Sequence, residues 1–121
     1  MKIDKENSDD LGFALSALAC QAITIDEFKE WVGFVIGNFQ YPEEFVDLLD
    51  AQFIVDACKA IPFTPTLADR EAIEKALYGV AYSRFSGLFD ASVPEPAARE
   101  ALSQRGDVLD RFRETFPFII P

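Results

Sequence analysis

The chain has 121 residues and a mass of 13.5 kDa, which is the size of one domain. Half of its residues are hydrophobic and 26% are charged, so the composition is that of a folded domain and not of a disordered chain. Histidine is absent, which excludes the Ser-His and Cys-His nucleophile pairs and most zinc and iron sites. With no run of about 18 apolar residues and no signal-peptide pattern at residues 1–6, we expect a cytoplasmic protein.

The charge is strongly negative and unevenly distributed. The chain has 21 acidic and 11 basic residues, a net charge of −10. Residues 1–60 hold 12 acids and 4 bases, whereas residues 61–121 hold 9 acids and 7 bases. Nucleic acids and anionic membranes bind cationic surfaces, so we expect neither as a partner. The charge favours a basic protein or peptide as partner, and the alternative is that acidity only keeps the chain soluble.

The first two predicted helices have clear start signals. Asn7 or Ser8 can cap a first helix that ends near Cys20. Thr24 and Glu27 have the spacing of a capping box, which predicts the start of a second helix. The second helix carries one apolar stripe, which consists of Phe28, Trp31, Val32, Val35, Ile36 and Phe39.

A third helical segment follows Pro42, which is tolerated at the first position of a helix. Its periodicity continues as far as Ile61, although Asp50 could instead cap a separate helix. The residues expected to face the interior here are Phe45, Leu48 and Leu49.

The second half of the chain contains a corner, a loop and three more helices. Residues 62–66 form the corner, and Thr66 is expected to cap a long helix. Residues 86–94 are predicted to be a loop, and a helix should run from Pro96 to Gln104. We expect Gly106 to stop that helix and Asp107 to cap the last one.

The predicted fold is therefore all-α, a single domain over residues 1–121 built as a bundle of five to seven short to medium helices. The apolar tail, residues 116–121, should fold back over the core. The aromatic residues expected in the core are Phe28, Trp31, Phe45, Phe53, Phe85, Phe112 and Phe116.

Several smaller features carry structural expectations. Gly33 and Gly37 form a GxxxG pattern that indicates close packing of helices, and Gly79 could serve the same purpose. Cys20 and Cys58 lie among apolar residues, so we expect two buried free thiols, with one disulfide as the alternative. Among the tyrosines, Tyr41 and Tyr82 are better candidates for an interface, where a phenol can lie at the rim.

The sequence contains no convincing catalytic or metal-binding pattern. Aligning Glu27 with the last ligand of an EF-hand loop places Leu18 and Cys20 at ligand positions and Gln21 at the required glycine, so calcium binding is not expected. Most carboxylates occur in first turns of helices, which the helix dipole explains. We therefore expect no enzyme activity, no metal and no cofactor, and a carboxylate-based hydrolase is the distant alternative.

The sharpest candidate site is a run of acids. Four acids and no base occur within residues 43–50, and helical spacing places Glu43, Asp47 and Asp50 on one face. Their mutual repulsion would be relieved by a cationic partner, and the alternative is a solvated face. With the exposed acid of the second helix and the candidate rim tyrosine, the predicted partner-binding set is Glu30, Tyr41, Glu43, Glu44, Asp47 and Asp50.

Parts of this segment resemble a known class of small bacterial proteins. The residues that carry the resemblance are Ile23-Thr24-Ile25-Asp26-Glu27-Phe28-Lys29-Glu30-Trp31, followed by Tyr41-Pro42 and by Phe45, Leu48 and Leu49. They are similar to segments of helical immunity proteins from polymorphic toxin and contact-dependent inhibition systems. The resemblance covers about a quarter of the chain and implies a cytosolic antidote that binds and blocks a cognate toxin domain, often a basic nuclease.

We therefore predict a non-enzymatic immunity protein that neutralises a basic toxin by blocking its active site. The alternative is a helical adaptor or regulatory module that binds a basic or amphipathic peptide. The two readings differ in partner, since the first requires a toxin and the second requires only a peptide.

Overall fold

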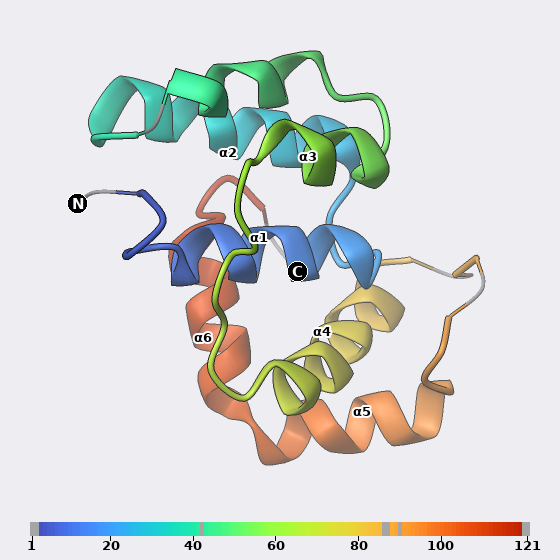
Figure 1. Cartoon of the computed structure of the whole chain (residues 1–121). Helices are drawn as coiled ribbons and strands as arrows, with labels where there is room; N and C mark the ends of the chain where they lie inside the picture. The colour runs from blue at the N-terminus through green and yellow to red at the C-terminus, as the bar shows by residue number, and fades with distance from the viewer. Residues whose placement is uncertain (1–2, 42, 86–87, 90, 120–121) are drawn as a thin grey trace.

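The computed structural model describes residues 3–41, 43–85, 88–89 and 91–119, and the secondary-structure elements of these residues are all helices (Figure 1). This confirms the predicted all-α class. The helices of the described residues are α1 (Asp9–Ala19), α2 (Ile25–Asn38), the 3-10 helix η1 (Glu43–Asp50), α3 (Ile54–Ala60), α4 (Arg70–Arg84), α5 (Glu95–Gln104) and α6 (Gly106–Thr115).

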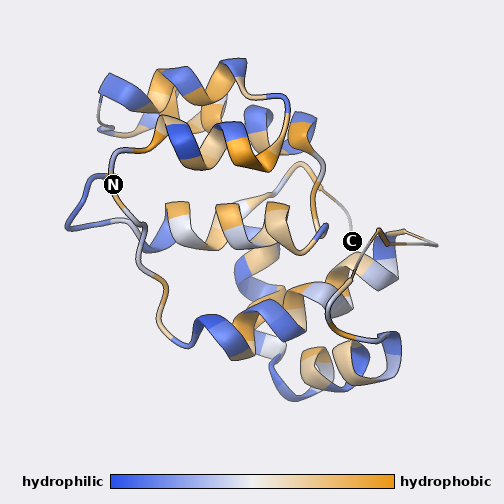
Figure 2. Cartoon of the chain, turned by 45° about the vertical axis from the view of Figure 1, so that its right-hand side comes forward, coloured by the Kyte–Doolittle hydropathy of each residue, from blue (hydrophilic) through white to orange (hydrophobic). Residues whose placement is uncertain are grey.

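Helix α1 lies in the middle of the molecule. In Figure 1, α2, η1 and α3 lie on one side of α1, and α4, α5 and α6 lie on the other. Every residue of α1 from Leu11 to Ala17 is buried. Figure 2 shows the same contrast, because orange and white predominate along α1 beyond its first turn while the outer helices carry blue faces. The centre of the core is thus a helix that is apolar around most of its circumference.

Helix α2 begins as the sequence predicts. The backbone N–H of Glu27 donates to the Thr24 hydroxyl at 3.2 Å, and the Thr24 N–H donates to the Glu27 carboxylate at 2.8 Å. This is a complete capping box. Phe28, Trp31 and the two stripe valines are buried, while Ile36 and Phe39 are partly buried. The predicted stripe therefore faces the core.

An aromatic cluster joins the two sides of the molecule. The ring of Trp31 lies 5.9 Å from that of Phe45 and 6.4 Å from that of Phe116. Phe116 also stacks on Phe13 of α1, with ring centroids 6.4 Å apart. Phe116 and Ile119 are buried, so the described part of the tail folds back over the core as expected, and residues 120–121 lie outside the described residues.

The start of α4 differs from the prediction. Thr66 does not cap this helix, because its backbone N–H donates to the Ser8 hydroxyl at 2.9 Å and its own hydroxyl bonds to Ser8 and Asp9. The helix begins at Arg70 instead, after Asp69 in a left-handed conformation with φ of 56°. A contact with α1 thus replaces the local cap.

The loop and the fifth helix agree with the prediction, but the boundary between the last two helices does not. The predicted fifth helix is present as α5, and the described residues among 86–94 lie outside helices, whereas 86, 87 and 90 are outside the described residues. Gly106 begins α6 and does not stop α5. Asp107 does not cap α6, since its carboxylate accepts two hydrogen bonds from the Arg105 guanidinium, both at 3.0 Å.

Close helix packing was expected at three glycines and is found at one of them. A Cβ atom at Gly79 would lie 2.6 Å from the Ala98 carbonyl oxygen and 2.8 Å from the Leu102 Cβ, so this glycine permits the close approach of α4 and α5. Gly33 and Gly37 are exposed, and a Cβ at either would have no described atom within 4 Å. The expected close packing at the GxxxG pattern is therefore wrong.

Four side-chain expectations also change. Phe53 is exposed, Phe85 is only partly buried, and Cys58 is an exposed free thiol, whereas Cys20 is buried and free as expected. The Tyr82 hydroxyl donates to the Val93 carbonyl at 2.8 Å, so it holds the loop before α5.

Candidate partner-binding surface

The acidic segment forms a 3-10 helix, and this changes which residues share a face. A 3-10 helix has three residues per turn, so positions three apart are aligned. Phe45, Leu48 and Ala51 follow this spacing and are all buried. The Ala51 N–H donates to the Leu48 carbonyl at 3.2 Å, which is a hydrogen bond of the 3-10 type. Burial of this apolar row against α2 and α3 favours the tighter helix.

The two exposed faces of η1 follow from the same spacing. Glu44, Asp47 and Asp50 align on one face, while Glu43 aligns with Val46 and Leu49 on the other. The predicted row of Glu43, Asp47 and Asp50 assumed an α-helix and is therefore wrong in its first member. Leu49, which was expected to face inward, is exposed because η1 buries every third residue and not its neighbours.

The other two predicted residues, Tyr41 and Glu30, lie outside η1. The Tyr41 ring lies 6.0 Å from the ring of Phe45, and its side chain is exposed, so it lies at the edge of η1. Glu30 is exposed on α2. It forms no hydrogen bond or ion pair with any residue that the structure describes. Five of the six predicted residues thus lie on or next to η1, on two of its faces, whereas Glu30 lies on α2.

The carboxylates of η1 have no described cation within ion-pair distance. Within the described part of the chain, Glu43, Glu44, Asp47 and Asp50 form no ion pair and no side-chain hydrogen bond. No basic residue occurs in the sequence between Lys29 and Lys59. The described cations that do form ion pairs all belong to the second half of the chain, and they are Arg70, Lys75, Arg84, Arg99, Arg105 and Arg111.

Exposed apolar side chains lie beside these acids. Val46 and Leu49 are exposed on η1, and Phe53 and Val55 are exposed at the start of α3, which packs against η1. Phe53 exposes 68% of its surface, the largest exposed fraction of these four residues. We call these four residues, together with Glu43, Glu44, Asp47 and Asp50, the η1–α3 surface. Exposed apolar groups bordered by charges are typical of protein interaction sites.

The orientation of Phe53 is set locally. The Asp56 carboxylate accepts hydrogen bonds from the backbone N–H groups of Gln52 and Phe53, both at 3.1 Å. These bonds satisfy free donors at the start of α3, so Asp56, and not Asp50, stabilises that helix start. Sequence reasoning missed the apolar half of this surface, because it placed Phe53 in the core. The three-residue spacing of Phe45, Leu48 and Ala51 was the available signal.

The η1–α3 surface combines charged and apolar groups. The eight residues that define it are carboxylates and hydrocarbon side chains, and the exposed thiol of Cys58 lies on α3 outside this set. Among the residues that the structure describes, no three His, Cys, Asp or Glu side chains gather into a group able to hold a metal ion. None of the helices in the described ranges is long and apolar enough to cross a membrane. Comparison with protein-family models, with curated proteins and with solved structures finds no match to this chain.

Proposed function

We propose that this chain is an immunity protein that binds a cognate basic toxin domain through the η1–α3 surface and blocks its active site. The observation that supports the proposal is that η1 and the start of α3 carry four carboxylates without ion pairs to described residues, next to four exposed apolar side chains. We take the class of partner from the resemblance to small immunity proteins, which residues 23–31, 41–42, 45, 48 and 49 carry.

Each half of the surface would serve a different step of binding. Carboxylates without cationic neighbours attract a positively charged partner and raise the rate of encounter. Burial of Phe53 and its apolar neighbours then slows dissociation, since well-packed aromatic anchors carry much of the energy of an interface. A toxin that binds nucleic acid has a cationic active site, so an acidic surface of this kind would compete directly with its substrate.

The proposal also places the protein in a compartment. A toxin that attacks intracellular nucleic acid must be neutralised where it acts, so we propose that the protein works in the cytoplasm.

The direct test uses the protein encoded next to this chain in its genome. Its toxic domain should arrest growth when produced alone, and coproduction of this chain should restore growth. The charge-reversed variant Glu44→Lys/Asp47→Lys should protect less well, whereas Glu100→Lys/Asp110→Lys, with the same net charge, should protect fully. If the neighbouring product binds but is harmless, the protein is no antidote and the adaptor function takes precedence.

The exposed apolar residues also fit a second function, that of an adaptor. Phe53 and Val55 could receive the apolar face of an amphipathic helix, as in an adaptor that binds a basic peptide. Titration with the isolated binding segment of the partner separates the two functions. An adaptor should bind this peptide about as tightly as the whole partner, whereas an immunity protein should need the folded toxin domain.

A further inference from the structure

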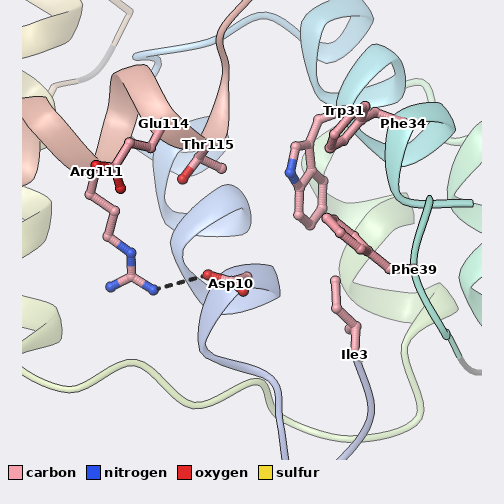
Figure 3. Close-up of a pocket in the computed structure, with 8 residues that line it drawn as sticks. All are labelled: Ile3, Asp10, Trp31, Phe34, Phe39, Arg111, Glu114 and Thr115. Carbon is pink, nitrogen blue, oxygen red and sulfur yellow. Dashed lines mark hydrogen bonds and ion pairs between the residues drawn. The ribbon is translucent and has the colours of Figure 1, made fainter. Parts of the chain in front are cut away.

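A second candidate site lies away from the acidic segment, in a pocket between α1, α2 and α6. Its volume is about 190 Å³, and Figure 3 shows the side chains that line it. One wall is apolar and consists of Ile3, Trp31, Phe34 and Phe39. A cavity of about 150 Å³ is sufficient for a benzene ring. The pocket therefore has room for one aromatic ring with a small substituent.

The ring nitrogen of Trp31 is the unusual group in this wall. Only 3% of the Trp31 surface is exposed, and its N–H forms no hydrogen bond with any described residue. No fully buried side-chain nitrogen or oxygen lacks a partner among these residues, so this nitrogen must be accessible from the pocket. In Figure 3 it faces the side on which Asp10 and Thr115 lie. Buried tryptophan N–H groups usually have an acceptor, and here the pocket is the place for one.

The opposite wall is polar and carries a net negative charge. The Arg111 guanidinium is already engaged, because it binds the Asp10 carboxylate at 3.5 Å and lies over the Phe13 ring at 4.6 Å. Glu114 and Thr115 form no side-chain hydrogen bond with a described residue. Two carboxylates against one guanidinium disfavour an anionic ligand, and they leave an acceptor free for a donor on the ligand.

We propose that this pocket binds a small uncharged aromatic compound that carries one hydroxyl group, of the phenol class. The ring would lie on the side of Trp31 that its indole nitrogen faces, between Trp31 and the polar wall. The hydroxyl oxygen would accept from the Trp31 N–H, and its hydrogen would be donated to Thr115, which lies on that side. Such a group uses both free functions of the pocket at once. This site is independent of the proposed immunity function, because it shares no residue with the η1–α3 surface.

The test uses phenol as the probe, with toluene and benzoate as matched probes. Trp31 is the only tryptophan, so a proton–nitrogen NMR spectrum contains one indole N–H signal that reports on this site alone. Phenol should move that signal downfield, with a dissociation constant on the order of 1 mM, as expected for a ligand of this size. Toluene should bind about five- to tenfold more weakly, because it lacks the hydrogen-bonding group. Benzoate should leave the signal in place.

A variant tests the role of the N–H group itself. Trp31→Phe keeps an aromatic wall and removes the donor, so phenol, observed through its own resonances, should bind about five- to tenfold more weakly. Thr115→Phe should fill the pocket and abolish binding. The proposal would be overturned if the indole signal did not move at a phenol concentration about ten times the expected dissociation constant. Water alone would then be the hydrogen-bond acceptor of the Trp31 N–H. Equal binding of toluene and phenol would also overturn the proposal. Both results come from the unaltered protein, so they hold even if Trp31→Phe fails to fold.

Discussion

Arg84, at the end of α4, binds the carboxylate of Glu27, at the start of α2, through two hydrogen bonds. Its two terminal nitrogens donate to the two carboxylate oxygens at 2.8 and 2.6 Å, and one of them also donates to the Ala22 carbonyl at 2.6 Å. Both side chains are largely buried. Because Glu27 also completes the capping box with Thr24, one carboxylate secures a helix start and connects the two sides of the molecule.

This arrangement predicts a pH-dependent contribution to stability. Burial alone acts to raise the pKa of Glu27, but hydrogen bonds from Arg84 and from the Thr24 backbone outweigh it, so the pKa lies below its ordinary value. A carboxyl group with a lowered pKa stabilises the fold above its unfolded pKa and loses that effect as the pH falls through the folded value.

Glu27→Gln should therefore lower the free energy of unfolding at pH 7 by about 1–3 kcal/mol. The difference from the wild type should shrink as the pH falls below about 4. Urea unfolding at several pH values measures both, and Glu100→Gln, at an exposed position, serves as control. A difference that stays constant down to acidic pH would contradict the assigned role of the ionised carboxylate.

Two glycines should respond to alanine in opposite directions. Gly79→Ala places a methyl group against the backbone of Ala98, so we expect a loss of about 1–3 kcal/mol. Gly33→Ala adds a methyl group in open space on the exposed face of α2 and should stabilise the protein by up to about 1 kcal/mol. Thermal unfolding of both variants decides the matter. Destabilisation by Gly33→Ala would mean that α2 packs on this face after all.

Phe45 and Phe53 should differ sharply on truncation. Phe45 is fully buried, so Phe45→Ala should cost about 3–5 kcal/mol. Phe53 is exposed, and Phe53→Ala should change the stability by no more than about 0.5 kcal/mol. Chemical denaturation of the two variants measures this difference. Similar losses at both positions would return Phe53 to the core and remove it from the η1–α3 surface.

Charge reversal on η1 should change association more than stability. Glu44→Lys/Asp47→Lys should leave the free energy of unfolding within about 0.5 kcal/mol per site, because both side chains are exposed. Its association rate with a basic partner should fall, and so should the dependence of that rate on salt. The matched control is Glu100→Lys/Asp110→Lys, with reversals on α5 and α6. Equal rates for the two double variants in stopped-flow measurements would show that the interface lies elsewhere.

The two thiols should react at very different rates. Burial, with the nearby Glu74 carboxylate, raises the pKa of Cys20 far above its ordinary value, so this thiol stays protonated and shielded at neutral pH. Cys58 is exposed and free. A thiol reagent at pH 8 should therefore label one site quickly, and Cys58→Ser should abolish that fast phase. Fast labelling that survives this substitution would contradict the burial of Cys20.

The sequence predicted those features whose causes are local. Thr24 and Glu27 are three positions apart, so their capping box could be recognised directly. Thr66 has an equally good capping side chain, but Ser8 binds it from 58 positions away, and no local pattern shows that competition. The prediction of which acids share a face was wrong for another reason. Spacings of three and four both fit the sequence of residues 43–50, and only the packing of Phe45 and Leu48 selects the 3-10 helix. The free N–H of Trp31 likewise depends on which distant side chains line its pocket.

The central position of α1 constrains how the chain can fold during synthesis. α1 leaves the ribosome before the other helices, yet it is buried on nearly all sides. Part of its cover, including the Phe116 ring that stacks on Phe13, is made only after α6. Early in translation α1 is therefore an apolar segment without its partners, of the kind that chaperones bind. Nascent chains arrested before α6 should be digested readily by protease, and chains extended past Phe116 should resist it.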